Sequence, residues 1–70
     1  MNRQATRKPP DRALVRAGFD YGASVRAHDR SRYTGRFGVV EEHNDGEIGV
    51  RFKNVAAVIW FSPAELEVSL

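Results

Sequence analysis

The chain has 70 residues, which is enough for one domain and near the lower limit of independent stability. It contains no cysteine, which excludes a disulfide framework, and its longest apolar stretch (residues 55–61) is too short to cross a bilayer, so we expect a cytoplasmic protein held together by hydrophobic packing. Residues 1–36 carry nine basic and three acidic side chains, whereas residues 37–70 carry two basic and six acidic ones, so the formal net charge of +2 divides into +6 and −4.

The N-terminal segment is basic and poor in apolar residues. Residues 1–12 include a Pro-Pro pair and cannot bury enough surface to order themselves. A short helix over 11–17 is one expectation, with Asp11 as its N-cap and Gly18 as its C-terminal stop, and a short edge strand over 13–15 is the alternative. We assign residues 1–18 to a largely disordered arm whose cationic side chains are Arg3, Arg7, Lys8, Arg12 and Arg16.

Beyond the arm, apolar residues recur with period two, which indicates half-buried strands. Short strands are predicted over residues 24–28, 37–43, 47–53, 58–61 and 66–68. The side chains predicted to point inward are Val25, Ala27, Val40, Ile48, Val50 and Phe52. The Asn-Asp-Gly sequence at 44–46 and Lys53-Asn54 are typical of tight turns. The pattern predicts an all-β domain over residues 19–70, a five-stranded SH3-like barrel with little helix.

Glycine and valine spacing supports this fold class. The stretch from residue 22 to residue 52 resembles a KOW-type motif, although the loop at 29–32 lacks the glycine that such motifs usually carry. The residues that match are Gly22, Val25, Gly35, Gly38 and Val40.

A second resemblance covers residues 22–68. Tyr33 and the terminal pattern of Phe61, Glu65 and Leu66 are similar to the small SH3-like barrels of photosynthetic electron transport, such as photosystem I subunit IV. Membership of that superfamily implies an accessory subunit that carries no cofactor and helps a partner dock.

A loop rich in arginine is the first candidate for a binding site. Arginine binds phosphate or carboxylate in a bidentate manner, and a tyrosine among arginines can stack on a base. The basic side chains outnumber the nearby acids Asp20 and Asp29, although pairing with these acids in a solvated loop is the alternative. The candidate residues are Arg26, Arg30, Arg32, Tyr33 and Arg36.

The direction of the Trp60 side chain decides whether the chain has a second candidate binding site. If Ile59 and Phe61 point inward, Trp60 points outward on the side of Phe37 and Val39, and an exposed patch of this kind marks an interface. Alternatively, Trp60 closes one end of the core and Phe61 turns out, because no polar residue in this run marks the outer face.

The sequence offers little for catalysis or metal binding. His28 and His43 have no spacing that suggests a zinc site and are expected on the surface. Glu41 and Glu42 are adjacent in a strand, so they are expected to point to opposite faces and not to form an acid/base pair. We expect neither a metal nor a cofactor, and we expect a binding module without enzymatic activity.

Two functions fit this description. The first is binding of nucleic acid or a nucleoprotein complex through the basic arm and the Arg/Tyr loop. The second is a docking subunit, or an inhibitor, that binds an acidic partner protein through the same arginines, with Trp60 and Phe37 as anchors. Neither function involves a membrane or a small-molecule substrate, and the oligomeric state stays open.

Overall fold

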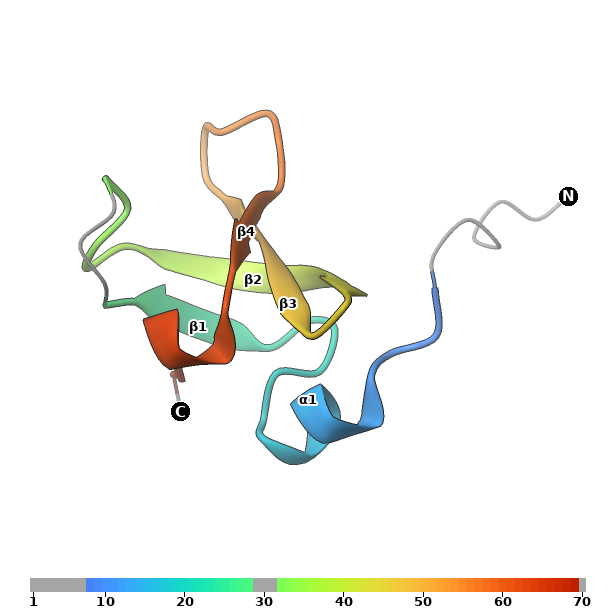
Figure 1. The fold of residues 1–70 in the computed structure, drawn as a ribbon. Helices are drawn as coiled ribbons and strands as arrows, with labels where there is room; N and C mark the ends of the chain where they lie inside the picture. The colour runs from blue at the N-terminus through green and yellow to red at the C-terminus, as the bar shows by residue number, and fades with distance from the viewer. Residues whose placement is uncertain (1–7, 29–31, 70) are drawn as a thin grey trace, which may run out of the picture.

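The computed structural model describes residues 8–28 and 32–69. Its strands are β1 (Ser24–Ala27), β2 (Phe37–Asn44), β3 (Glu47–Phe52), β4 (Ile59–Phe61) and β5 (Leu66–Val68). The helical elements are the short α-helix α1 (Arg12–Arg16) and the 3-10 turn η2 (Pro63–Glu65). The predicted all-β class, with five strands and little helix, is therefore confirmed (Figure 1).

All strand pairs are antiparallel, in the order β4-β3-β2-β1-β5. The long strand β2 pairs with β1 and with β3, and the last strand returns to pair with the first. Strands β4 and β5 form the two edges, so the sheet is not closed. The turn between β2 and β3 uses Asp45 and Gly46, both with positive φ (52° and 80°), as the Asn-Asp-Gly sequence predicts.

The core lies on one face of this curved sheet. All six side chains predicted to point inward are buried there. Phe52 forms an aromatic cluster with Tyr33, whose ring is stacked on it at 4.8 Å between centroids, and with Phe61 at 5.9 Å. Leu14 and Phe19, which flank the end of α1, complete the core from the N-terminal side.

The N-terminal helix forms as expected, and the alternative of an edge strand over 13–15 is wrong. Asp11 is the N-cap, and its carboxylate accepts hydrogen bonds from the backbone N–H groups of Ala13 (2.9 Å) and Leu14 (3.4 Å). Gly18 has a φ of +98° and ends the helix. A helix of five residues is marginal by itself, so its stability depends on the burial of Leu14.

Replacing Asp11 with alanine is expected to lower the free energy of unfolding by about 1 kcal/mol, because two backbone donors at the helix N-terminus lose their acceptor. Urea titration followed by the fluorescence of the single tryptophan measures this change. The control is Asp20→Ala, since the Asp20 carboxylate accepts a hydrogen bond from the N–H of Tyr21 outside any helix. An equal loss in both variants would contradict the capping role.

A β-bulge in β2 changes which side chains face the core. Val40 pairs with Val50, but the next pair is Glu42 with Gly49, so Glu41 is an extra residue in β2. Beyond the bulge, the alternation of side chains is offset by one position. Glu42 is therefore exposed like Val39, and His43 is buried with only 4% of its surface accessible.

This bulge overturns two expectations from the sequence. His28 is exposed, but His43 is not a surface residue. Glu41 and Glu42 do not point to opposite faces, because both line the outer side of the sheet. A strict period of two cannot anticipate either result, since one inserted residue reverses the facing of everything that follows it.

The buried His43 side chain joins the helix segment to the sheet. Its Nδ1 accepts a hydrogen bond from the backbone N–H of Asp11 (2.9 Å), which leaves Nε2 as the protonated nitrogen that donates to the carbonyl of Phe19 (2.7 Å). The ring of Tyr21 packs on the imidazole at 4.7 Å between centroids. As a result, α1 lies close to the hairpin that joins β2 and β3 (Figure 1).

Some predictions concern residues 1–7, 29–31 and 70, which lie outside the described residues. These residues include Arg3, Arg7 and Arg30. The division of the chain at residue 18 stays a prediction. Within residues 8–28 and 32–69, no helix has the length and apolar character needed to cross a bilayer.

Candidate functional site

Arg26, the first residue of the predicted arginine site, lies in β1 and is engaged with the protein itself. Arg26 lies directly opposite Glu67 in the β1–β5 pair, and its guanidinium forms an ion pair with that carboxylate at 2.9 Å (Nη2 to Oε2). A hydrogen bond from Nε to the same oxygen, at 3.0 Å, fixes the side chain further. The positive charge of Arg26 is therefore partly neutralised before any partner arrives.

Tyr33 lies against the core and does not present an open stacking platform. Its ring stacks on Phe52 with an angle of 11° between the planes. The guanidinium of Arg36 lies 5.7 Å from the Tyr33 ring centroid and donates a hydrogen bond to the carbonyl of Lys53 (3.3 Å). Arg32 is exposed. Arg36 is also exposed, but among the described loop arginines it is the one held in place by such contacts.

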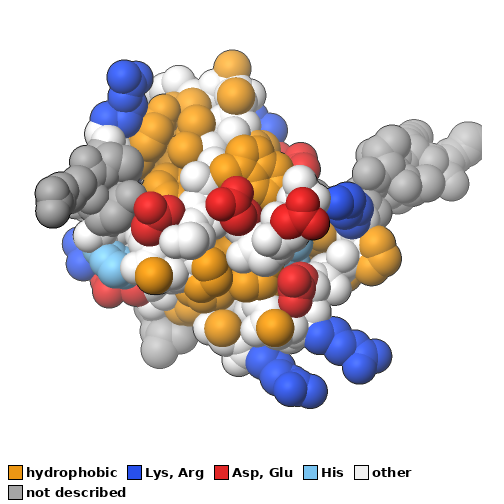
Figure 2. Space-filling view, viewed as in Figure 1, with side chains coloured by type: hydrophobic (Ala, Val, Ile, Leu, Met, Phe, Trp, Pro, Cys, Tyr) orange, Lys and Arg blue, Asp and Glu red, His pale blue; other side chains and the backbone are white. Residues whose placement is uncertain are grey.

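The described cations of the basic arm also differ in whether they are bound within the protein. Arg12 and Arg16 are exposed and lie one helical turn apart on α1. Lys8 instead donates a hydrogen bond from Nζ to the side-chain oxygen of Asn44 (2.6 Å). Figure 2 shows basic side chains at the periphery of the molecule, including the end where α1 lies, and a row of acidic side chains across the middle.

The exposed large apolar side chains lie on the outer face of β2 and β4. Phe37 is 60% exposed, Val39 45% and Trp60 40%. Phe61 is buried at 3%, so Trp60 points outward and the alternative in which Phe61 turns out is wrong. The structure therefore places Phe37 and Trp60 on the solvent side of the sheet.

Gly49 makes room for Trp60 on this outer face. It lies between Glu42 on β2 and Trp60 on β4 in the same row of the sheet. A Cβ atom at Gly49 would lie 3.1 Å from the indole ring and 2.6 Å from Cγ1 of Val58. The indole ring therefore rests directly on the backbone of β3, which explains a glycine in the middle of a strand.

Arg51 is fixed on the same face. Its guanidinium binds Glu41 through Nη2 (2.8 Å to Oε1) and Nε (3.4 Å to Oε2), and it also donates to the carbonyl of Ala56. The hydrogen bonds that Arg51 donates to Glu41, followed by the charge of that carboxylate, raise the pKa of Arg51, and the charge of Glu42 adds a smaller effect in the same direction. Arg51 and Glu41 thus form a neutral pair beside Val39, which lies opposite Arg51 in the sheet.

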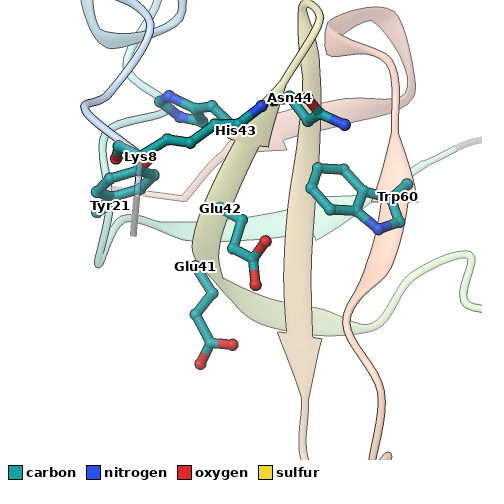
Figure 3. A pocket seen from close by; sticks show the side chains of 7 residues that line it. All are labelled: Lys8, Tyr21, Glu41, Glu42, His43, Asn44 and Trp60. Atoms are coloured by element: carbon teal, nitrogen blue, oxygen red, sulfur yellow. Dashed lines mark hydrogen bonds between the residues drawn. The ribbon is translucent and has the colours of Figure 1, made fainter. Parts of the chain in front are cut away.

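A groove of about 330 Å³ lies beside this pair (Figure 3). Its wall on β4 is Trp60, its opposite wall is Tyr21, and the bulge in β2 brings both glutamates between them. The lining residues are Lys8, Tyr21, Glu41, Glu42, His43, Asn44 and Trp60. An open groove of this composition suits an extended polar ligand better than an enclosed apolar one.

Sequence reasoning identified only part of this groove. It singled out Trp60, but it attached no role to Tyr21 or Asn44 and placed the two glutamates on different faces. Two consecutive charged residues in a strand that otherwise alternates are the one signal in the sequence for a bulge at this position.

Across residues 8–28 and 32–69, no three side chains of the metal-binding types are grouped to hold an ion. Comparison with protein-family models gives no match, and a search of curated proteins gives none either.

Proposed function

We propose that the protein is a small binding module without enzymatic activity, and that it docks onto a partner protein through the outer face of β2, β3 and β4. The observation that carries this proposal is the exposure of Phe37, Val39 and Trp60 on that face. Uncovered aromatic and branched side chains on one face are typical of protein interfaces, where tryptophan is enriched among the residues that dominate affinity.

The fold supports the same proposal. A sheet in which the last strand pairs with the first, and in which one long strand is shared by both halves, is compatible with a partly closed SH3-like barrel. In a domain this small, the few buried side chains are needed to fill the interior, which leaves no room for an enclosed substrate cavity. The outer face of the sheet is the surface that stays available for binding.

Nucleic-acid binding is the second candidate. Exposed Arg12 and Arg16 on α1, together with Arg32, favour it. Against it, Arg26 is paired with Glu67. A site built from three free cations would release about three counterions, so the logarithm of the affinity would fall with the logarithm of salt concentration at a slope of about −3.

The docking proposal predicts a large effect of Trp60→Ala. Truncation of a tryptophan at the centre of an interface is expected to cost about 2 kcal/mol or more in binding, which weakens affinity roughly 30-fold. The assay compares the wild type and Trp60→Ala as bait in host extract with and without nuclease treatment, identifies the retained protein, and measures its affinity with purified components.

The matched control is Arg12→Ala with Arg16→Ala, which removes two exposed cations far from the apolar face in sequence. Docking through the outer face leaves this double variant within about twofold of the wild type, since both arginines lie on α1 and not on β2, β3 or β4, and exposed surface charges contribute little. Binding that is lost in the arginine variant, abolished by nuclease and unaffected by Trp60→Ala would instead establish the nucleic-acid function.

A further inference from the structure

We propose that the groove between Trp60 and Tyr21 binds an arginine side chain of the partner, with Glu42 as its counter-ion. This inference rests on the proposed docking face and adds the chemistry of the residue that the partner inserts. It differs from the expectation of an acidic partner, because the aromatic residue on this face is accompanied by carboxylates rather than by free arginines.

The charge of Glu42 is the first argument. Glu41 is already bound by Arg51, whereas Glu42 has no hydrogen bond or ion pair with another described residue. Arg51 acts on Glu42 through its charge but forms its ion pair with Glu41, and Lys8, which also lines the groove, directs its ammonium to the side chain of Asn44. Glu42 is therefore an exposed carboxylate in the groove whose acceptor capacity is left for a ligand.

The spacing of the sheet is the second argument. Glu42, Gly49 and Trp60 lie in one row across three strands. The backbones of Glu42 and Trp60 are therefore two strand spacings, or about 10 Å, apart. Gly49 contributes no side chain between them, and the indole ring lies over it. Figure 3 shows the side chains of Glu42 and Trp60 on either side of β3. A flat cation that rests on the exposed part of the indole ring can therefore extend its edge toward the carboxylate.

The shape of that space favours arginine over lysine. A guanidinium is planar, stacks on aromatic rings and donates two parallel hydrogen bonds to a carboxylate. An ammonium group satisfies the charge but offers neither the planar contact nor the paired donors. The segment that forms β2 to β5, residues 37–70, carries a net charge of −4, which also favours a cationic ligand over an anionic one.

The test is an NMR titration of the full chain with a short acetylated and amidated Gly-Ser peptide that contains a single arginine. The chain has one tryptophan, so its indole N–H signal is unambiguous. We expect a saturable shift of this signal with the arginine peptide. Matched peptides with lysine, or with the neutral isostere citrulline, are expected to bind at least threefold and tenfold more weakly, respectively.

Variants of the protein test the role of Glu42. Glu42→Gln is expected to weaken binding of the arginine peptide at least tenfold. Asp45→Asn is the matched control, because it removes the same charge from an exposed turn residue, and asparagine tolerates the positive φ of 52° at this position. The control is expected to bind within twofold of the wild type.

Three results would overturn the inference: equal binding of the citrulline peptide, an unchanged affinity in Glu42→Gln, or an equal loss in Asp45→Asn, which would indicate a general charge effect. The citrulline comparison uses the wild-type protein and so does not depend on the folding of a variant. A partner whose capture depends on Trp60, combined with no preference for arginine, would refute this inference while leaving the docking function intact.

Discussion

Replacing His43 with phenylalanine is expected to lower the free energy of unfolding by about 2 to 4 kcal/mol. Phenylalanine keeps an aromatic ring of similar shape but has no nitrogen atoms. The part-buried backbone N–H of Asp11 and the buried carbonyl of Phe19 would both lose their partner, and a buried group left unpaired costs about 1 to 3 kcal/mol. A domain of this length has a free energy of unfolding of roughly 4 to 10 kcal/mol, so the expected loss is a large fraction of the total stability.

Urea unfolding measures the change, and amide hydrogen exchange locates it. Because His43 connects the α1 segment to the end of β2, exchange in α1 is expected to accelerate more than exchange in β3. The control is the same replacement at exposed His28, with an expected change within about 0.5 kcal/mol. A loss below about 1 kcal/mol at His43 would mean that water replaces both hydrogen bonds.

Gly38→Ala is expected to destabilise the protein by about 2 to 3 kcal/mol, the upper part of the range for an overpacked core. Gly38 lies between Val25 and Phe52 in the sheet. A Cβ atom there would lie 2.5 Å from Cγ1 of Val50 and 2.9 Å from the backbone carbonyl oxygen of Arg51. Contacts this short with the centre of the sheet require the backbone itself to move.

Gly49→Ala provides the comparison for this prediction. Its added methyl group would meet Val58 and Trp60, which are side chains on the outer face that can move toward solvent. For Gly49→Ala we expect the free energy of unfolding to fall by about 1 kcal/mol and the tryptophan fluorescence to change. Thermal unfolding separates the two variants, since each kcal/mol corresponds to about 4–8 °C in Tm for a domain of this size. Equal Tm values would contradict the assignment of Gly38 to the core side.

The sequence is most informative where local chemistry alone fixes the structure. Alternation in residues 47–53 identifies the buried face of β3, the Asn-Asp-Gly sequence identifies the hairpin, and Asp11 with Gly18 delimits α1. These features depend on neighbouring residues and on backbone preferences, so no knowledge of distant contacts is needed.

The candidate site is harder to obtain from the sequence. Trp60 belongs to an apolar run in which both facings are compatible with a strand, and only the burial of Phe61 against Phe52 decides between them. Tyr33 illustrates the opposite case: its position among arginines suggests a stacking surface, but the tertiary fold uses the ring to cover the core. Both outcomes depend on which side chains fill the interior most efficiently.

The sequence by itself determined the division of charge, the absence of cysteine, the strands and turns, and the inward residues of the regular strands, because composition and local periodicity carry that information. Only the tertiary structure decides the pairing of Arg26 with Glu67, the burial of His43 and the placement of Glu42 and Trp60 along one groove. These depend on strand register and on a single bulge, which arise only when strands distant in sequence pair.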